Sequence, residues 1–428
     1  MEGSFVLIFR TRLLAAALVT AAVAAACGSG ESSGVDATAS PCAPGVTDDE
    51  VNVGILYPDT GVLSAQFTGY RFGVEARFAE ANATGGVGGR QVSTIWRDDR
   101  FDAAGNLQAA RDLLRENVFA VLEYTAHSEQ STPFLHDKGI PVVGIGDQAA
   151  WADNDNMFPL AYQVDDTDAT STLGDFVRAQ GGTRAAIITT AITESAVMYA
   201  QNARRSLEAA GIPIVFADTD ASSAGSSPEA VARIVGSGAD TLISLASPDL
   251  YTGAVTAAAA ANRPFKVALS PITYDTQLLN TPTARALVGT YSTVGFSAIE
   301  RNLPAHRAYL AAMTTYAPEI QPPTQLSSIY GYITADLFLR GLQAQQGCPT
   351  RESYISGLHG LTHYDAGGLL NGPVNLAAGQ RTVDLCTDFV RVAATGSAFE
   401  PVGAKPLCGR VIGGDAQGAG GSAPTGRQ

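Results

Sequence analysis

From Val51 onward, short apolar runs alternate with longer segments in which apolar residues recur every three or four positions. The runs predict strands, and the periodic segments predict helices. Strands and helices that alternate in this way form βαβ units, in which the strands are parallel and helices cover both faces of the sheet. The predicted fold class is therefore α/β.

The alternation occurs twice. The first series predicts strands at 51–57, 91–97, 119–124 and 140–145, with Asp102 as the N-cap of one intervening helix. After a crossing segment at 158–166, the pattern starts again with a helix from about Asp168. The second series predicts strands at 184–190, 212–218, 240–246 and 265–270. Two doubly wound, Rossmann-like lobes in tandem are expected.

The region after the second series differs in character. Helical stretches are expected at 303–317 and 325–346, followed by short strands punctuated by glycine and proline. Residues 411–428 have low sequence complexity, so a disordered tail is expected there.

The N-terminus has the pattern of a secretory signal. Arg10 and Arg12 precede an apolar run at 13–23, and three alanines then precede Cys27. The cysteine after small residues resembles a bacterial lipobox, which implies removal of residues 1–26 and lipidation of Cys27. Ala24 stands where a lipobox usually has leucine, so secretion without lipidation remains the alternative. Residues 27–45 are predicted to be a flexible tether, and the chain to be anchored at the outer face of the cell membrane.

Four further cysteines, an even number in an exported chain, favour disulfides. Three pairings are possible. Cys386 with Cys408 is favoured because a Gly/Ser-containing turn separates two apolar stretches, as in a hairpin, and Cys42 with Cys348 then follows by elimination. A zinc site is the weaker alternative, since the cysteines are not clustered.

Composition excludes one class of partner. Lysine occurs three times, charged residues make up 16% of the chain, and the net charge is −14, so no basic surface for nucleic acid is expected.

The sequence also lacks motifs for a cofactor or for catalysis. It has neither a P-loop lysine followed by Ser or Thr nor a G-x-S-x-G nucleophile elbow. His359 and His363 are four residues apart, but Gly360 stands where a zinc protease needs glutamate. The pairs Asp98-Asp99 and Asp165-Asp166 can be helix caps or acid/base pairs, and capping is favoured. We expect no enzyme, cofactor or metal.

The stretch GGVGGR at 85–90 has half of a dinucleotide fingerprint, but it follows a predicted helix and precedes a strand. This order is the reverse of a phosphate loop and predicts a left-handed helix end with a tight turn.

Together with Thr60-Gly61, Gly73, Asn82 and Asp98-Asp99, the GGVGGR stretch resembles the pattern of type I periplasmic binding proteins. The resemblance is to the solute-binding lipoproteins of branched-chain amino acid ABC importers. Further matching segments are KGIPVVGI (138–145), LEAAGIPIV (207–215), TRESYISGL (350–358) and GPVNL (372–376).

This resemblance implies two lobes joined by three hinge crossings, with a first lobe of 46–164 plus about 297–370 and a second of 165–296 plus about 371–410. A monomer that binds a small solute and hands it to a membrane permease and its ATPases is expected. Ligands of open α/β sheets bind beyond the carboxyl ends of the strands.

The loops at those positions supply the predicted ligand-binding residues. Hydroxyls for a ligand carboxylate, acids for a ligand ammonium and rings for an apolar part are expected, and a helix cap or solvated loop is the alternative for each. The residues with these three roles are Thr60, Ser64 and Ser128; Glu194, Asp249 and Asp275; and Tyr124, Tyr251 and Tyr274. Gln66, His127, Asp147, Gln148 and Ser195 complete the set.

Several positions depart from the family pattern. Glu123, Tyr124 and His127 replace glycine and small residues, and Gly146-Asp147-Gln148 replaces a loop rich in Ser, Ala and Thr. An acid at the carboxylate subsite would repel a ligand carboxylate, so a polar neutral or cationic solute is expected. A ligand sensor that signals to a separate membrane protein is the alternative function, since the same fold serves both roles.

Overall fold

The computed structural model describes residues 42–61, 64–146, 149–160, 168–190, 194–219, 221, 227–279, 281–345, 347–377 and 384–413. Asp147, Gln148, Cys27 and the Asp165-Asp166 pair therefore lie outside the described residues. The described part falls into two parallel-sheet lobes, and each is built from two separate stretches of the chain.

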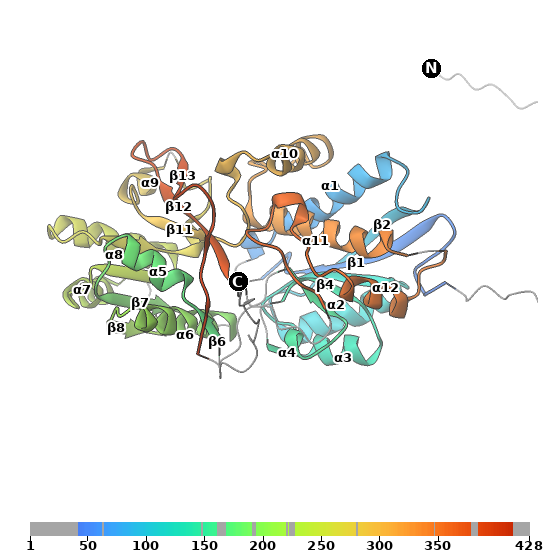
Figure 1. The fold of residues 1–428 in the computed structure, drawn as a ribbon, viewed down its shortest axis with the longest axis horizontal. Helices are drawn as coiled ribbons and strands as arrows, with labels where there is room; N and C mark the ends of the chain where they lie inside the picture. The colour runs from blue at the N-terminus through green and yellow to red at the C-terminus, as the bar shows by residue number, and fades with distance from the viewer. Residues whose placement is uncertain are drawn as a thin grey trace, which may run out of the picture. The chain divides into compact units, whose positions relative to one another are not determined.

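The first lobe has a five-stranded, fully parallel sheet in the order β2-β1-β3-β4-β5, with helices on both faces (Figure 1). Its elements from the first stretch of chain are β1 (Glu50–Tyr57), η1 (Ser64–Gln66), α1 (Gly69–Ala83), β2 (Gln91–Asp98), α2 (Ala103–Arg115), β3 (Ala120–Tyr124), α3 (Ser131–Asp137), β4 (Val142–Ile145), α4 (Ala149–Ala152) and β5 (Met157–Pro159). As predicted, Asp102 caps α2, because its side chain accepts a hydrogen bond from the Gly105 N–H at 2.7 Å.

The second lobe begins with β6 (Asp168–Thr170), α5 (Thr172–Ala179), β7 (Ala185–Thr189), α6 (Glu194–Ala209), β8 (Ile214–Asp218), α7 (Pro228–Gly236), β9 (Thr241–Leu245), α8 (Pro248–Ala260), β10 (Val267–Leu269), η2 (Pro271–Thr273), α9 (Pro282–Ala286) and β11 (Tyr291–Val294). The chain then returns to the first lobe through η3 (Ile299–Arg301), α10 (Pro304–Tyr316), α11 (Leu326–Gln343), α12 (Arg351–His359) and η4 (Ala366–Gly368). It ends in the second lobe with β12 (Cys386–Val392), β13 (Phe399–Pro401), β14 (Leu407–Cys408) and β15 (Val411–Gly413).

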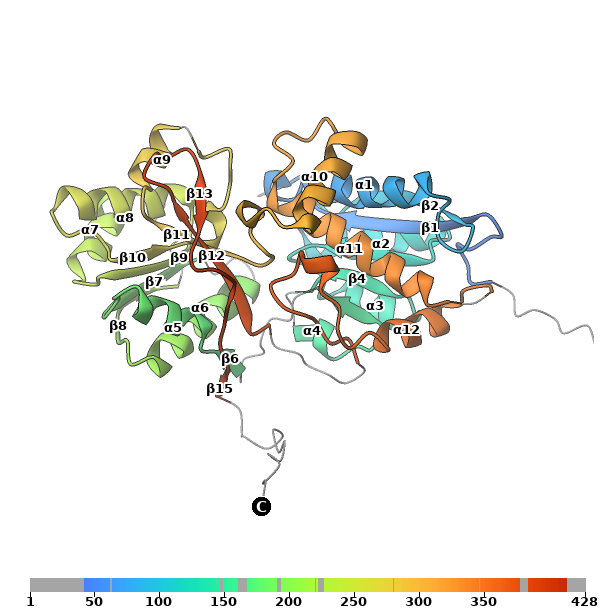
Figure 2. The same ribbon diagram turned by 45° about the horizontal axis from the view of Figure 1, so that its top comes forward.

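The second sheet has eight strands, with the order β13-β12-β11-β10-β9-β7-β8 and β14 paired to β12. Strands β7 to β11 are parallel, whereas β12 and β13 are antiparallel to their neighbours. Figure 2 shows β12 beside β11, and β15 beside β6 at the end of the described chain.

Two expectations are wrong, one about the C-terminal tail and one about the helix expected from about Asp168. Residues 411–413 form β15 instead of belonging to a disordered tail, and their antiparallel partner is β6, where a helix from Asp168 was predicted. The reason is that Val411 and Ile412 are β-branched and offer a strand partner, so the helix begins only at Thr172.

The predicted tether also ends earlier than expected. Cys42 pairs with Cys348, and the Ala43 N–H donates to the Pro349 carbonyl at 3.1 Å, which fixes this segment to the first lobe. The second disulfide joins Cys386 and Cys408 across β12 and β14, which is the favoured hairpin pairing.

The turn between α1 and β2 has the conformation that the glycines predict. Gly86 donates to the Ala81 carbonyl at 3.0 Å with a φ of +76°, which ends the helix. Gly88 and Gly89 have φ values of +59° and +82°, and the residues on either side exchange two backbone hydrogen bonds. Positive φ at both central positions defines a two-residue hairpin turn and leaves no phosphate cradle.

Asn82 covers part of the open edge of this sheet. Strand β2 lies at the edge, and the Asn82 amide both donates to the Val92 carbonyl and accepts from the Val92 N–H, each at 2.9 Å. The side chain thus imitates a neighbouring strand, which protects an edge that could otherwise pair with another chain.

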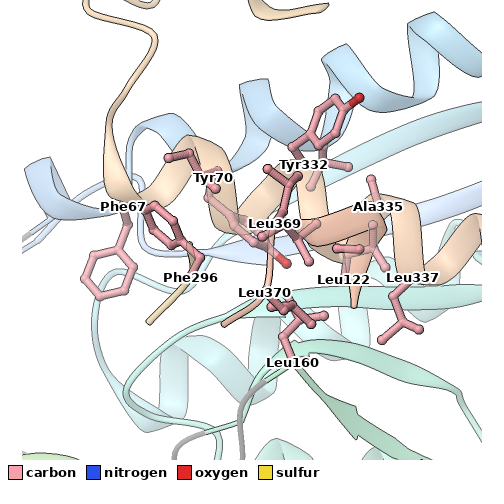
Figure 3. Packing of buried hydrophobic residues seen from close by; sticks show 14 of the residues in the cluster. Phe67, Tyr70, Leu122, Leu160, Phe296, Tyr332, Ala335, Leu337, Leu369 and Leu370 are labelled. Carbon is pink, nitrogen blue, oxygen red and sulfur yellow. The ribbon is translucent and has the colours of Figure 1, made fainter. Parts of the chain in front are cut away.

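The core of the first lobe forms around α11, which is buried on almost every side. Its residues Tyr332, Ala335 and Leu337 belong to the same buried cluster as Leu122 of β3 and Leu160 (Figure 3). Helix α1 crosses α11 so closely that only glycine fits at the contact. A Cβ on Gly73 would lie 1.9 Å from the Ser328 carbonyl oxygen, and one on Gly331 would lie 2.0 Å from that of Tyr70.

We predict that Gly73→Ala lowers the free energy of unfolding by roughly 3 kcal/mol, since the helices must separate to admit a methyl group. The matched control is Gly236→Ala at the end of α7, where a Cβ would meet nothing within 4 Å. The control should be neutral or stabilise by up to about 1 kcal/mol. Urea denaturation of both variants checks the prediction, and equal stability of the two would contradict it.

Candidate functional site

Asp98 holds together the loops that follow β1 and β2 in the first lobe. Its carboxylate accepts hydrogen bonds from the Asp59 N–H at 2.9 Å, the Arg100 N–H at 2.8 Å and the Thr60 hydroxyl at 2.6 Å. Partial burial alone would raise the pKa of Asp98, but these hydrogen bonds outweigh it and hold the pKa below its ordinary value. Thr60, predicted as a donor to a ligand carboxylate, is exposed and already donates its hydroxyl proton to Asp98.

A buried polar network lies beneath these loops. Asp99 is fully buried and accepts hydrogen bonds from the Phe101 N–H at 2.8 Å and from the Thr125 hydroxyl. The Asn106 amide of α2 lies 3.4 Å from Asp99 and donates to Glu123 at 2.9 Å. Burial raises the pKa of Asp99, although these donors act in the opposite direction. Both Asp98 and Asp99 therefore hold loop backbone, and neither caps the next helix, because the N-cap of α2 is Asp102.

Glu123 does not lie where an acid would meet a ligand carboxylate. Its residue is 1% exposed, and its side chain reaches Asn106 in the space between the sheet and α2. Successive strand residues point to opposite faces, so Tyr124 lies on the other side from Glu123. Glu123 is therefore not placed to repel a ligand carboxylate, and it gives no reason to exclude an anionic group in the solute.

The predicted residues of the loop after β3 differ in exposure. Ser128 is completely buried, and its hydroxyl accepts a hydrogen bond from the Trp151 indole N–H at 3.0 Å. His127 is partly exposed, with its Nδ1 3.9 Å from Glu129 and its ring edge-on to Phe101 at 4.8 Å. Tyr124 is also partly exposed and contacts the ring of Phe67 at a centroid distance of 4.7 Å. Contacts with Trp151 give Ser128 a structural role in the fold, whereas His127 and Tyr124 retain exposed surface.

Two further first-lobe residues lie in the short helix η1. Ser64 is partly exposed and Gln66 is exposed. The Ser64 carbonyl accepts hydrogen bonds from the Phe67 N–H at 2.9 Å and the Thr68 hydroxyl at 3.3 Å. These bonds connect η1 to the start of α1.

The predicted second-lobe residues follow β7, β9 and β10. Glu194 and Ser195 begin α6, and their side chains are outside the described part. Asp249 is exposed in the first turn of α8, whereas Tyr251 in the same helix is fully buried. Asp275 is partly exposed and accepts a hydrogen bond from the Gln277 N–H at 2.7 Å. Of these, Asp249 and Asp275 keep exposed carboxylates.

Tyr274 packs against η3, where the chain returns to the first lobe, and does not lie in open solvent. It is 6% exposed, and its hydroxyl donates to Glu300 at 2.8 Å and accepts from the Ile299 N–H at 3.3 Å. Burial raises the pKa of Glu300, even though the hydrogen bond from Tyr274 opposes the shift. The predicted ring contact with a ligand is thus replaced by a structural contact with η3.

An ion pair joins η3 to β12. Arg301 donates to both carboxylate oxygens of Asp388 at 2.5 Å, and Asp388 also accepts from the Ala298 N–H at 2.9 Å. Their side chains are 8% and 0% exposed. Two parallel hydrogen bonds from one guanidinium fix orientation as well as charge, so η3 is held against β12.

Asp384 lies two residues before the start of β12, where the chain re-enters the second lobe. Its carboxylate accepts a hydrogen bond from the Cys386 N–H at 3.0 Å. Burial raises the pKa of Asp384 to about 6, and the single backbone hydrogen bond only partly offsets this shift.

Because the folded pKa exceeds the unfolded value, folding favours the protonated acid, and stability is lost as the pH rises through about 6. We therefore predict that Asp384→Asn raises the free energy of unfolding by up to roughly 3 kcal/mol at about pH 8, a gain that disappears below about pH 4. Urea denaturation across this range measures the effect. The matched control is Asp365→Asn, since Asp365 makes the same bond to the N–H two residues on but is exposed. A gain for Asp384→Asn that does not depend on pH would be incompatible with this explanation.

The structure brings aromatic residues together that sequence reasoning missed. Phe67 and Phe101 lie 5.8 Å apart by ring centroid, and Tyr330 of α11 lies 5.7 Å from Tyr124. Phe101 follows the strand predicted at 91–97 by four residues, which is a signal that the sequence contained, whereas Phe67 lies ten residues after the strand predicted at 51–57. The contribution of Tyr330 depends on packing of α11 and had no local signal.

Among the described residues, no group of three His, Cys, Asp or Glu side chains is arranged to hold a metal ion. Within the same ranges, no helix combines the length and apolar character needed to span a bilayer.

The fold defines a two-lobed α/β protein with polar and aromatic residues at the carboxyl ends of its strands. Residues 50–397 match the sequence model of the family described as periplasmic binding protein. The chain belongs to the periplasmic binding protein family, which is a family of binding proteins and not of enzymes.

Comparison with individual relatives agrees with this assignment. The Leu/Ile/Val-binding protein homolog 2 of Brucella abortus (strain 2308) is 33% identical over 78 residues, which are 18% of this chain and 21% of that protein. The matched segment thus spans about a fifth of the length of the curated relative. The substrate-binding periplasmic protein of Ralstonia solanacearum has a TM-score of 0.68 at 18% identity, covering 82% of this chain and 99% of that one. An ABC transporter solute-binding protein from R. palustris, solved with 4-hydroxybenzoate, has a TM-score of 0.67 at 17% identity, covering 84% and 98%.

Proposed function

We propose that this chain is an extracytoplasmic solute-binding lipoprotein that captures a small polar solute between its lobes and delivers it to an ABC importer. The observation that carries the proposal is the match of residues 50–397 to a family of binding proteins. An amino acid, an amide or a related compound is the solute class. The structural relative from R. palustris is named as a component of an ABC transporter, which supports the transport role.

The proposed binding residues are those at the carboxyl ends of the strands that keep exposed surface. They are Thr60, Ser64, Gln66, Tyr124 and His127 in the first lobe, and Asp249 and Asp275 in the second. Closure would be a hinge motion about the three crossings. The acids and hydroxyls provide orientation, while the rings provide apolar contact.

The thermal midpoint of the secreted chain should rise with one member of a panel of amino acids, amides, urea, polyamines and aromatic acids. A ligand at about 100 times its dissociation constant adds roughly 2.7 kcal/mol to the free energy of unfolding. Substitution of both Asp249 and Asp275 by Asn tests the site, with Asp365→Asn as the control. The proposal is in difficulty if no compound on the panel shifts the midpoint. The sensor alternative would be favoured if the chain binds a solute and cells that lack the partner permease, and so do not take it up, still respond to it.

Lipidation at Cys27 is tested separately. We predict that Cys27→Ser moves the protein from the membrane fraction to the medium and removes the mass of a diacylglyceryl group, because the thioether is the proposed anchor. Cell fractionation and mass spectrometry of the mature N-terminus measure both effects. Cys386→Ser is the matched control, because it removes a cysteine within the second lobe. A wild-type protein with an unmodified Cys27 would leave secretion without lipidation as the explanation.

A further inference from the structure

The loop between β2 and α2 holds Phe101 in an unusual backbone conformation. Arg100 and Phe101 have φ values of 58° and 57°, a left-handed conformation that residues other than glycine rarely adopt. The Asp98 carboxylate accepts from the Arg100 N–H and the Asp99 carboxylate from the Phe101 N–H, each at 2.8 Å. Two consecutive left-handed residues are thus held by two neighbouring acids.

The loop after β1 is shaped to match. Gly61 has a φ of +100°, and a Cβ there would lie 2.3 Å from the Arg100 carbonyl oxygen. A side chain at Gly61 would therefore displace the loop that carries Phe101. Strain that the surroundings maintain in this way is typical of positions that place a side chain for function.

The side chain that this backbone places is an aromatic ring among other rings. Phe101 is partly exposed, lies 5.8 Å from Phe67, and meets His127 edge-on at 4.8 Å with an interplanar angle of 86°. Tyr124 extends the group at 4.7 Å from Phe67, and Tyr330 continues it at 5.7 Å from Tyr124. We call Phe67, Phe101, Tyr124, His127 and Tyr330 the aromatic platform. Phe67 lies at one end of the buried cluster shown in Figure 3, so the platform continues from the core.

The platform combines apolar surface with exposure at the edge of the sheet where ligands of this fold class bind. Phe101, Tyr124, His127 and Tyr330 all keep part of their surface accessible. The neighbouring acids Asp98 and Asp99 accept hydrogen bonds from backbone N–H groups and from the hydroxyls of Thr60 and Thr125. Phe101 stays partly exposed beside His127 and Phe67, and aromatic groups pair face-offset or edge-to-face, so a further ring has an aromatic surface to pack against.

We propose that the solute has an aromatic ring, and that Phe101 is a specificity-determining residue that contacts it. This inference rests on the proposed solute-binding function and narrows its ligand class. An aliphatic side chain gains only apolar contact from the platform, whereas an aromatic ring also gains the preferred ring geometry. Selectivity for aromatic over saturated compounds follows.

The test uses pairs of probes that differ only in the aromaticity of the ring. Benzoate is compared with cyclohexanecarboxylate, benzylamine with cyclohexylmethylamine, and phenylalanine with cyclohexylalanine, by calorimetric titration of the secreted chain. At least one aromatic probe should bind about three- to tenfold more tightly than its saturated partner. Equal affinity within every pair would overturn the inference.

Variants at Phe101 assign the effect. Phe101→Leu retains apolar bulk and Phe101→Ala removes it. Both variants should bind the aromatic probe about tenfold more weakly, and their affinity for its saturated partner should change less. Trp96→Ala, at an exposed aromatic residue on β2, is the matched control and should leave both affinities unchanged. Circular dichroism establishes folding, and Phe101→Leu decides the matter if Phe101→Ala does not fold. Unchanged aromatic affinity in Phe101→Leu would overturn the role of Phe101.

The outcomes separate this inference from the proposed function. Binding of a non-aromatic amino acid, amide or polyamine, with no aromatic probe bound, would overturn the inference and leave solute binding intact. Failure of every compound in both sets to bind would instead overturn the proposed function, and the inference with it.

Discussion

The close approach of α1 and α11 is the contact on which the two-lobed arrangement depends. The backbone of each helix touches the other at Gly73 and Gly331, so the helices interlock more tightly than side chains would allow. In the chain, helix α11 comes after strands β7 to β11 of the second sheet. The first lobe is therefore complete only when the chain has formed part of the second lobe and returned. Crossings between the lobes are a direct consequence of this contact.

Polar contacts hold η3 against β12. Arg301 and Asp388 bring a buried charge pair to the point where η3 meets β12, and Tyr274 adds a hydrogen bond to Glu300. A buried pair of this kind offers little net stability over apolar packing, but removal of one partner leaves the other charge without compensation. Such a pair therefore specifies one arrangement of the crossing segments. In the proposed hinge closure, η3 and β12 would therefore move together.

The sequence predicted the fold well because its signals were local. Strand runs, the Asp102 cap and the turn around Gly88 each depend on residues within one or two turns of chain. Asn82 belonged to the recognised pattern, but its role in covering the edge of β2 required knowledge of which strand lies outermost. The strand at 411–413 depends on β6, more than two hundred residues earlier, so its composition alone predicted disorder.

Residues at the site were harder to predict because exposure is a property of packing. Glu123 at the end of β3 and Ser128 in the loop after it are both buried, with Asn106 and Trp151 as their hydrogen-bond partners. A loop position at the carboxyl ends of the strands is therefore insufficient to identify a ligand contact. The direction of the side chain must also be known, and in a strand it changes with every residue.

The polar residues at the carboxyl ends of β2 and β3 serve mainly to shape the loops. Asp98 uses its carboxylate for Thr60 and for loop N–H groups, and Asp99 uses its own for the Phe101 N–H and Thr125. Carboxylates engaged in this way have fewer oxygen lone pairs free to accept hydrogen bonds from a solute. Phe101, Tyr124 and His127 keep part of their surface accessible beside them. Asp98 and Asp99 thus act through the backbone that they hold, and under the proposed function the selectivity of the first lobe depends on the aromatic side chains that this backbone presents.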